Sequence, residues 1–523
     1  MNSLHVTTRV PLEIFSMICS NLIAEEDIFS ASQVCHHWRG ALIASPSLWT
    51  HLPCRDVTRT ILSLERCKYL PVRLGFYRQS LDVALEEVLL HGNKITTLTI
   101  HQPLDRIPSL HRLLMFSRPF VERLHIRCEK KTGWGPNDQN PHEIWQDLPS
   151  LRELFVCQYT IPVAQLSAPN LAHLALQEPA HGRVRVTIES ILGMLRGCPL
   201  LETLLISCSN IDQWPTGDHP PVSLPRLRAI EFGVDEVRSG LITHLHLSPG
   251  VAVGFRDLSK AEVCGNIPPA ALATMQYVLG RFDIHCVTLA VFSSARGDHD
   301  LLIRFEGLRA SLEITAVVAT LTELRNVLFG QTGVLFSHSP RIRNVRELHI
   351  AGYSFLDDQD LSHIGTALPN LVSISFFRCK DPHMFLLLTH TSRRSPPFPR
   401  LERIMALCPK LGLRRVVKKR RDCGVPLKTL VVGREPNEIG NGRLEDYAAL
   451  GEFVDDLRIG CPVEISDWGA ENEVLNIWSN IGIPRPVSPN RSLPFTVLTL
   501  FRSPFLLGYV NTLNFVGSSF PDV

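Results

Sequence analysis

The sequence lacks long hydrophobic runs and has little excess charge of either sign. Its longest lipid-like stretch, near 314–324, is too short to span a bilayer and has Glu313 and Glu323 at its edges. Residues 1–15 contain no apolar run that would serve as the core of a signal peptide. A formal net charge of +2 gives no general reason to expect nucleic acid or an anionic membrane as a partner. We therefore expect a cytoplasmic or nuclear protein that binds neither nucleic acid nor membrane.

The sequence also lacks the short motifs that mark metal sites and common enzymes. Its 14 cysteines never form a C-x-x-C pair, which argues against a zinc knuckle and a thioredoxin-type motif. No G-x-S-x-G, H-E-x-x-H, P-loop or G-x-G-x-x-G motif is present. We predict no catalytic residue, no metal and no cofactor, and we interpret the cysteines as reduced thiols. An enzyme with an unrecognised site stays open as an alternative.

Residues 9–52 combine helix-start signals with apolar residues at helical spacing. Pro11 suits a first helical position because its fixed φ and missing N–H cost nothing there. Ile14 and Ile18 then recur one turn apart on one face, and two further short helices are predicted between residues 25 and 42. The segment is too small to bury all this apolar surface within itself. An apolar face left exposed on such a unit usually indicates a docking surface.

These residues resemble the F-box. The matching positions keep the family's order and spacing and are Pro11, Glu13, Ile14, Phe15, Ile18, Leu22, Asp27, Ile28, Val34, Cys35, Trp38, Arg39, Pro46, Leu48 and Trp49. The resemblance implies docking onto the adaptor Skp1, and through it onto a cullin, within an SCF-type ubiquitin ligase. The residues expected to bind Skp1 are Pro11, Leu12, Glu13, Ile14, Phe15, Ile18 and Ile28. The alternative is three packed core helices of a larger domain.

The chain after residue 52 reads as a repeat array. Helices are expected over 56–69 and 81–90, and strands over 71–76 and 95–100. An apolar-x-x-apolar-x-apolar pattern then starts at residues 121, 151, 171, 201, 227, 242, 345, 371, 401, 427 and 454. Many starts lie 26 to 30 residues apart, a period that fits leucine-rich repeats. A proline stands two residues before six of these starts: Pro149, Pro169, Pro199, Pro225, Pro369 and Pro399.

The predicted fold is α/β: a small all-α F-box over 1–52, an irregular, horseshoe-like leucine-rich-repeat solenoid over 53–462, and a C-terminal cap or tail over 463–523. The period is interrupted between about 250 and 340. Strands are expected there at 283–291 and 300–307, with a helix over 311–327, and the long spacings require insertions or repeats that the pattern does not detect.

One side of the predicted strands supplies the candidate binding face. The residue between the last two apolar positions of each strand, and the residue two before it, should lie on the exposed, concave side of the repeats. Candidate client-binding residues on this side are Phe155, Leu205, Glu153, His173 and His125. A mixed surface of this kind suits a protein client better than an anionic polymer. The alternative is that the two apolar side chains are covered by another part of the chain.

Two further segments allow more than one interpretation. The run Leu413–Arg421 could be an import or nucleic-acid signal, but its apolar residues share one helical face, which favours the solvated face of a repeat helix. The polar stretch 128–148 carries Trp134 and Trp145. These rings either pack on the repeat body or belong to an insertion near the binding face.

The cysteines and the Cys35-His36-His37 triplet are interpreted as structural. Neighbouring residues of a helix point about 100° apart, so the triplet cannot converge on one metal. Cysteines also follow several predicted strands, where they are expected to be buried as small apolar side chains: Cys128, Cys157, Cys208, Cys379 and Cys461.

The predicted function is that of a substrate-recruiting, non-catalytic subunit of an SCF-type ubiquitin ligase. It would bind a Skp1-like adaptor through the F-box and an unknown protein client through the repeats. The alternative is a leucine-rich-repeat scaffold that binds Skp1 without directing ubiquitylation. An N-terminal F-box followed by divergent repeats also resembles the expanded F-box families of mushroom-forming fungi.

Overall fold

The computed structural model divides into two compact units. It describes residues 11–19, 25–54, 56–77, 88–103, 112–115, 117, 119–129, 145, 148–157, 166–177, 186–207, 211–212, 220–233, 241–248, 250–258, 277–280, 283–293, 299–307, 311–318, 342–352, 364–377, 398–407, 413–433 and 449–461. Of these, the first unit holds the residues up to Val186 and Ser190–Leu201. The second holds Thr187–Glu189 and the residues from Glu202 onwards. Among all the residues that the structure describes, no helix is long and apolar enough to cross a membrane.

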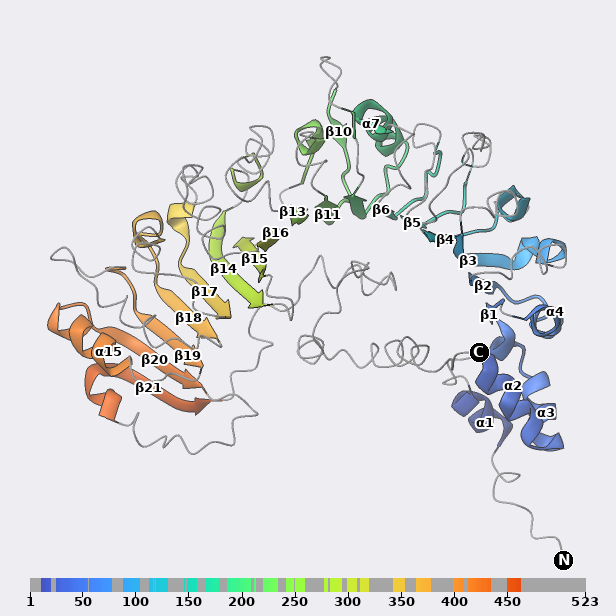
Figure 1. Ribbon diagram of the computed structural model, residues 1–523, viewed down its shortest axis with the longest axis horizontal. Coiled ribbons are helices and arrows are strands. Elements are labelled where there is room, and N and C mark those ends of the chain that lie inside the picture. Colours follow the sequence, from blue (N-terminus) through green and yellow to red (C-terminus); the bar gives the residue numbers. More distant parts are fainter. Residues whose placement is uncertain are drawn as a thin grey trace, which may run out of the picture. The chain divides into compact units, whose positions relative to one another are not determined.

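The first unit opens with short helices that agree with the predicted ones (Figure 1). They are α1 (Leu12–Cys19), α2 (Glu25–Val34), α3 (His36–Ile43) and the 3-10 helix η2 (Pro46–Trp49). Cys35 caps α3, because its Sγ accepts a hydrogen bond from the backbone N–H of Trp38 at 3.4 Å. His36 and His37 are exposed on the helix that follows. The triplet therefore serves to start a helix, as the structural interpretation predicts.

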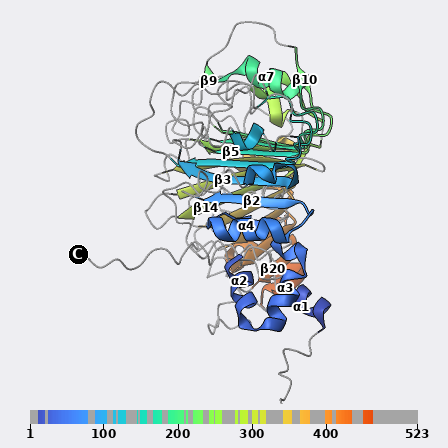
Figure 2. The same cartoon turned by 90° about the vertical axis from the view of Figure 1, so that its right-hand side faces the viewer.

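The same unit continues directly into a parallel strand ladder. Its strands are β1 (His51–Pro53), β2 (Val72–Tyr77), β3 (Ile95–Pro103), β4 (Arg123–Glu129), β5 (Glu153–Cys157) and β6 (His173–Gln177), each paired with the next. Helix α4 (Val57–Arg66) connects β1 to β2, and η3 (Gly92–Lys94) precedes β3. Figure 2 shows β2, β3 and β5 stacked above α2 and α3. The expected boundary at 52/53 thus falls inside β1. The expected helix over 81–90 is described only at residues 88–90, which are helical.

The second unit contains a longer ladder with an inserted antiparallel segment. It begins with β8 (Thr203–Ser207), β11 (Ala229–Phe232) and β13 (Ala252–Leu258), which run parallel. It passes through β16 (Ser311–Val318), β15 (His299–Gly307) and β14 (Ile284–Ser293), of which β15 runs antiparallel to both neighbours. It then returns to parallel pairing with β17 (Glu347–Gly352), β18 (Ser373–Phe377), β19 (Arg403–Leu407), β20 (Leu427–Gly433) and β21 (Val454–Cys461).

Shorter elements complete the described chain. They are β7 (Val186–Thr187), α7 (Ile188–Arg196), β9 (Ile211–Asp212), β10 (Val222–Ser223), η7 (Leu241–His244), β12 (Leu245–His246), η8 (Ile342–Asn344), α15 (Leu413–Asp422) and η9 (Ala449–Phe453). The predicted fold class is confirmed: an all-α N-terminal region followed by parallel strands with helices, consistent with a leucine-rich-repeat solenoid.

Two of the predicted elements are wrong. Residues 311–318 form strand β16, not a helix, because they pair with β13 on one side and β15 on the other, which satisfies their backbone groups along the ladder. The remaining residues of that expected helix lie outside the described part. Residues 242–247 do not join the ladder, since β12 pairs with β10. Strand β13 takes that place, with Ala252 opposite Ala229.

The six spaced prolines share one structural role. Each is the second residue of a turn closed by a backbone hydrogen bond, as in the 3.2 Å bond from the N–H of Leu151 to the carbonyl oxygen of Leu148 around Pro149. Proline suits this position because its φ is already fixed near −65°. The third turn residue also links repeats: Asn170 Nδ2 donates to the carbonyl oxygen of Pro149 at 2.7 Å. Each of the six strands therefore follows its proline turn after the same number of residues.

Arg420 departs from the predicted solvated face of α15. Its side chain is 1 % exposed, and its Nη2 donates to the carbonyl oxygens of Phe398 and Leu401 at 3.0 and 3.2 Å. Phe398 has φ 57°, a left-handed conformation that is rare for a bulky residue. Burial lowers the pKa of Arg420 to about 10, which leaves it protonated at neutral pH. Arg420, although part of the basic run Leu413–Arg421, is thus a buried tether that holds the turn before β19 through its hydrogen bonds.

Replacing Arg420 by alanine is expected to lower the free energy of unfolding of the second unit by about 1–3 kcal/mol, because two buried carbonyl oxygens lose their donor. Hydrogen exchange of the β19 and β20 amides measures the change. Arg414→Ala, on the exposed side of the same helix, is the matched control and should stay within about 0.5 kcal/mol. Equal protection in both variants would contradict the tether.

Candidate functional site: an exposed helix face and a polar strand face

Helix α1 leaves a large apolar stripe uncovered. The side chains of Ile14, Met17 and Ile18 are 44, 59 and 54 % exposed and stand at i, i+3 and i+4, which is one face of a helix. Cys19 is 2 % exposed and faces the interior. The helix therefore packs on its own unit with one side and offers adjacent large apolar side chains on another.

The helical region is joined to the first repeat through an aromatic core. Trp49 is 1 % exposed, donates from Nε1 to the carbonyl oxygen of Leu42 at 2.8 Å, and meets the Phe29 ring edge-on at 5.3 Å between centroids. The Arg66 guanidinium of α4 lies over the Trp49 ring at 4.4 Å. An aromatic face attracts a cation that lies over it, and the attraction is stronger where water is excluded. The backbone adds two further links: the Arg73 N–H donates a hydrogen bond to the carbonyl oxygen of Thr50, and strand β1 pairs with strand β2.

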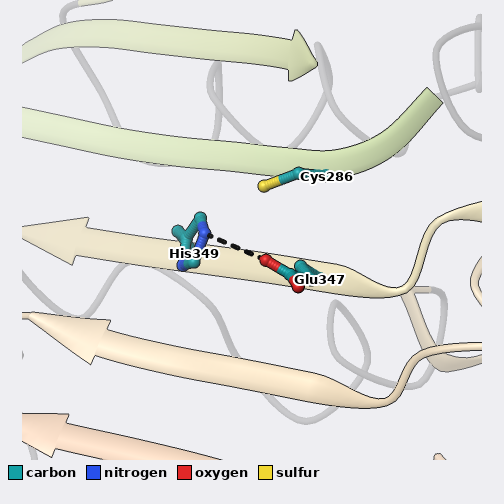
Figure 3. Close-up of side chains that lie close together, drawn as sticks. All are labelled: Cys286, Glu347 and His349. Carbon is teal, nitrogen blue, oxygen red and sulfur yellow. Dashed lines mark ion pairs between the residues drawn. The ribbon is translucent and has the colours of Figure 1, made fainter. Parts of the chain in front are cut away.

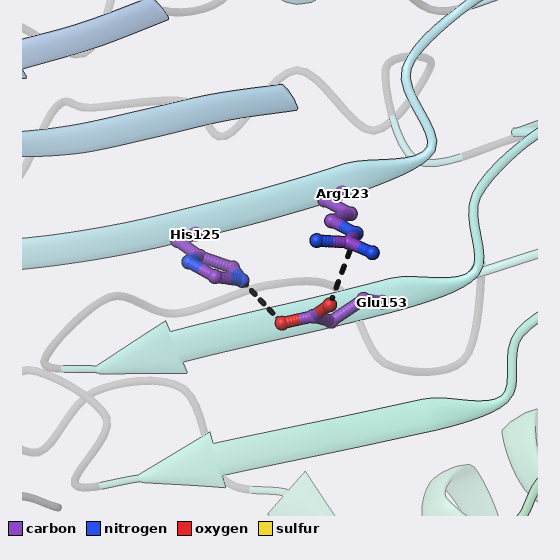
Figure 4. A network of polar contacts seen from close by, with 3 residues as sticks. All are labelled: Arg123, His125 and Glu153. Carbon is purple, nitrogen blue, oxygen red and sulfur yellow. Dashed lines mark hydrogen bonds and ion pairs between the residues drawn. The ribbon is translucent and has the colours of Figure 1, made fainter. Parts of the chain in front are cut away.

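The strand face of the first unit carries a polar network. Parallel register places Arg123 of β4 beside Glu153 of β5, and His125 beside Phe155. Figure 4 shows the carboxylate of Glu153 between the other two polar side chains: Oε1 lies 2.6 Å from His125 Nε2 and Oε2 lies 3.5 Å from Arg123 Nε. The Phe155 ring meets the His125 ring edge-on at 6.0 Å. Glu153 is buried while Arg123 is half exposed, so the network runs from the interior to the surface.

Comparison with known families identifies the first part of the chain. Residues 7–55 match the family described as F-box-like. The N-terminal segment is an F-box-like domain. No curated protein matches this chain in sequence. A solved structure described as the yeast Rad7 and Elc1 complex contains a chain with 14 % identity, aligned over 70 % of this chain and 91 % of that one, with a TM-score of 0.24.

Within the F-box-like domain, the predicted docking residues separate into three groups. Pro11, Ile14 and Ile18 are exposed. Ile28 is only 7 % exposed, and with Ala31 and Ser32 it forms the inward face of α2. Contact between Ile28 and the adaptor stays a prediction. The side chains of Leu12, Glu13 and Phe15 lie outside the described residues. Met17 was not among the predicted docking residues. Its position three residues after Ile14 places both side chains on one helix face and could have predicted it.

The predicted exposure of the strand-face candidates is also corrected. Phe155, Leu205 and Glu153 are 5, 3 and 3 % exposed, so burial by other parts of the chain is the alternative that holds. Phe155 lies in register between His125 and Ala175 of the two adjacent strands, and Glu153 lies between Arg123 and His173. His125 and His173 are half-buried. Leu205 belongs to β8 of the second unit, and the other four lie on β4–β6 of the first.

The remaining predicted segments are partly described. Trp145 is fully buried, which confirms packing for that ring, while Trp134 and residues 131–142 lie outside the described part. Cys157 is buried, as expected. The side chains of the other four cysteines after strands are outside the described residues.

Proposed function

We propose that this chain is a non-catalytic, substrate-recruiting subunit of an SCF-type ubiquitin ligase. The single observation that carries the proposal is the exposed stripe of Ile14, Met17 and Ile18 on an F-box-like domain. Large apolar side chains on a small helical unit are costly in water and suit the core of a protein interface. The partner proposed for this stripe is a Skp1-like adaptor, which in turn binds a cullin.

The junction supports such a role because recruitment works through proximity. A subunit that only positions a client raises the rate by holding the reacting groups close together, which requires a stiff connection between its two binding surfaces. The Trp49–Arg66 contact and the β1–β2 pairing provide that connection between the F-box-like domain and the first repeats.

For the client, we propose contact with the accessible part of the strand face. Arg123, His125 and His173 reach the surface, whereas Glu153 and Phe155 support them from below. In the second unit, Leu205 has the same supporting position on β8, opposite Glu231. The surface side chains carry positive or titratable groups, so an acidic segment of a client protein fits them best.

Two affinity purifications test the proposal. An α1 variant, Ile14→Asp/Ile18→Asp, is expected to lose the adaptor and keep the client. A face variant, Arg123→Gln/Arg127→Gln, is expected to keep the adaptor and lose most of the client, since both side chains are exposed. The buried Glu153 carboxylate loses its ion pair with Arg123 but keeps its 2.6 Å contact with His125. Loss of the same partners in both variants would refute two separate surfaces.

Client half-life then separates a ligase subunit from a scaffold. A client that is degraded faster with wild-type chain than with the α1 variant indicates ubiquitylation, and an unchanged half-life with intact adaptor binding indicates a scaffold. Activity of the purified chain alone, without E1, E2 or adaptor, would instead indicate an enzyme.

A further inference from the structure

Three metal-ligating side chains meet in the second unit where the antiparallel insertion rejoins the parallel ladder. Cys286 lies on β14, and Glu347 and His349 lie on β17. Their ligand atoms, one thiol sulfur, one carboxylate oxygen and one imidazole nitrogen, all lie within 4.8 Å of one another. Figure 3 shows the three side chains on the same side of the two strands.

The strand register explains why these residues converge. The parallel pairing of β14 with β17 places Cys286 directly opposite Glu347. His349 follows two residues later and so projects from the same face. Sixty-one positions separate Cys286 from Glu347 in the sequence, because strands β15 and β16 intervene along the chain. No short ligand motif results, which is why the sequence predicts no metal.

We propose that Cys286, Glu347 and His349 form a binding site for a thiophilic divalent cation of the zinc type. Zinc binds thiolate sulfur at about 2.3 Å and imidazole nitrogen or carboxylate oxygen at about 2.0–2.2 Å. A tetrahedral centre with those bond lengths separates its ligands by about 3.3–3.8 Å. The cluster needs to contract by about 1 Å, which the half-exposed Glu347 side chain allows by rotation.

Burial and charge at the cluster also suit a cation. Cys286 is 2 % exposed and forms the inner wall, while the His349 and Glu347 side chains are 21 and 49 % exposed and leave an entry from solvent. Glu306 of β15 lies opposite Cys286 on its other side and adds a second carboxylate near the site. Burial lowers the pKa of His349, against the opposing effect of Glu347 and Glu306.

A bound metal would tie β14 to β17 where the described ladder returns from antiparallel to parallel pairing. The protein supplies three ligands to the metal and leaves its fourth coordination position for water. The site does not depend on the proposed ligase function, since it lies in a unit and on residues that the adaptor surface does not use.

Cobalt titration of the full-length, tag-free chain tests the site. After removal of metal with a chelator, Co²⁺ is expected to bind at one ion per chain with a thiolate-to-cobalt charge-transfer band, and Zn²⁺ is expected to displace it. Cys286→Ala should abolish the band, and Glu347→Gln should weaken binding by about tenfold or more. Cys198→Ala removes another buried thiol and should leave the band unchanged.

A second readout guards against variants that fail to fold. Zn²⁺ should raise the unfolding temperature of the wild type and of Cys198→Ala, but not that of His349→Gln, whose side chain lies nearer the surface. A wild-type chain without the charge-transfer band, or a band of equal size in Cys286→Ala, overturns the proposal.

Discussion

Aspartate at both Ile14 and Ile18 is expected to weaken binding of a Skp1-like adaptor by at least about 100-fold. Fully burying an exposed isoleucine contributes about 1.5–3 kcal/mol, and Ile14 and Ile18 are 44 and 54 % exposed, so the two together contribute about 1.5–3 kcal/mol. A factor of 100 requires roughly 2.8 kcal/mol. The carboxylates would add a desolvation penalty. Both side chains are exposed in the free chain, so the folded state should be unaffected. Titration calorimetry with the purified adaptor measures the loss.

The matched control is Leu90→Asp. Leu90 is 76 % exposed, also apolar, and lies in the same unit but outside the F-box-like domain. Its replacement introduces one carboxylate, against two in the α1 variant, and should leave the affinity within about twofold of the wild type, since it removes no contact with the adaptor. An adaptor affinity that survives in the α1 variant would show that the stripe is not the interface.

Replacing Trp49 by alanine is expected to destabilise the F-box-like domain by about 3–5 kcal/mol. The substitution removes a buried ring that touches Phe29 and Arg66, and it removes the donor to the Leu42 carbonyl oxygen. Hydrogen exchange is the suitable measurement, because it resolves local opening in a chain of two units where a single unfolding free energy is poorly defined. Protection should fall in α2, α3 and β1.

Two companion variants separate the causes. Arg66→Ala removes the cation that lies over the Trp49 and Phe29 rings and is expected to cost about 0.5–2 kcal/mol. Val34→Ala truncates a side chain that is 61 % exposed and should change protection very little. If Trp49→Ala left the exchange of β1 as it is in the wild type, the F-box-like domain and the first repeat would not be coupled through this ring.

Local patterns in the sequence predicted most of the regular elements. The helices at 12–19, 25–34 and 36–43 follow from the helix-start signal of Pro11 and from apolar spacing, which act within one or two turns. Ten of the eleven repeat starts become ladder strands. The turns around the six prolines follow from a fixed φ, a property of the residue itself.

Errors arose where partners distant in sequence decided the outcome. Residues 311–318 are extended because they pair with β15, which ends at Gly307, and with the distant β13, which ends at Leu258. In the sequence, Arg420 is one cation of a basic run and is expected to be exposed. In the structure its guanidinium is buried, because it donates to the carbonyl oxygens of Phe398 and Leu401. Glu153 and Phe155 stand at positions that the strand pattern places on the exposed side, yet both side chains are buried in the folded chain.

The amino-acid sequence by itself determined that an F-box-like helical segment precedes a repeat array, because residue identity and spacing are local properties of the chain. Only the tertiary structure decided which side chains remain accessible: it left Ile14 and Ile18 in solvent, buried Ile28 and Phe155, and placed Cys286 beside Glu347. Accessibility and convergence depend on which strands and helices become neighbours, and burial is a property of those neighbours rather than of the residue.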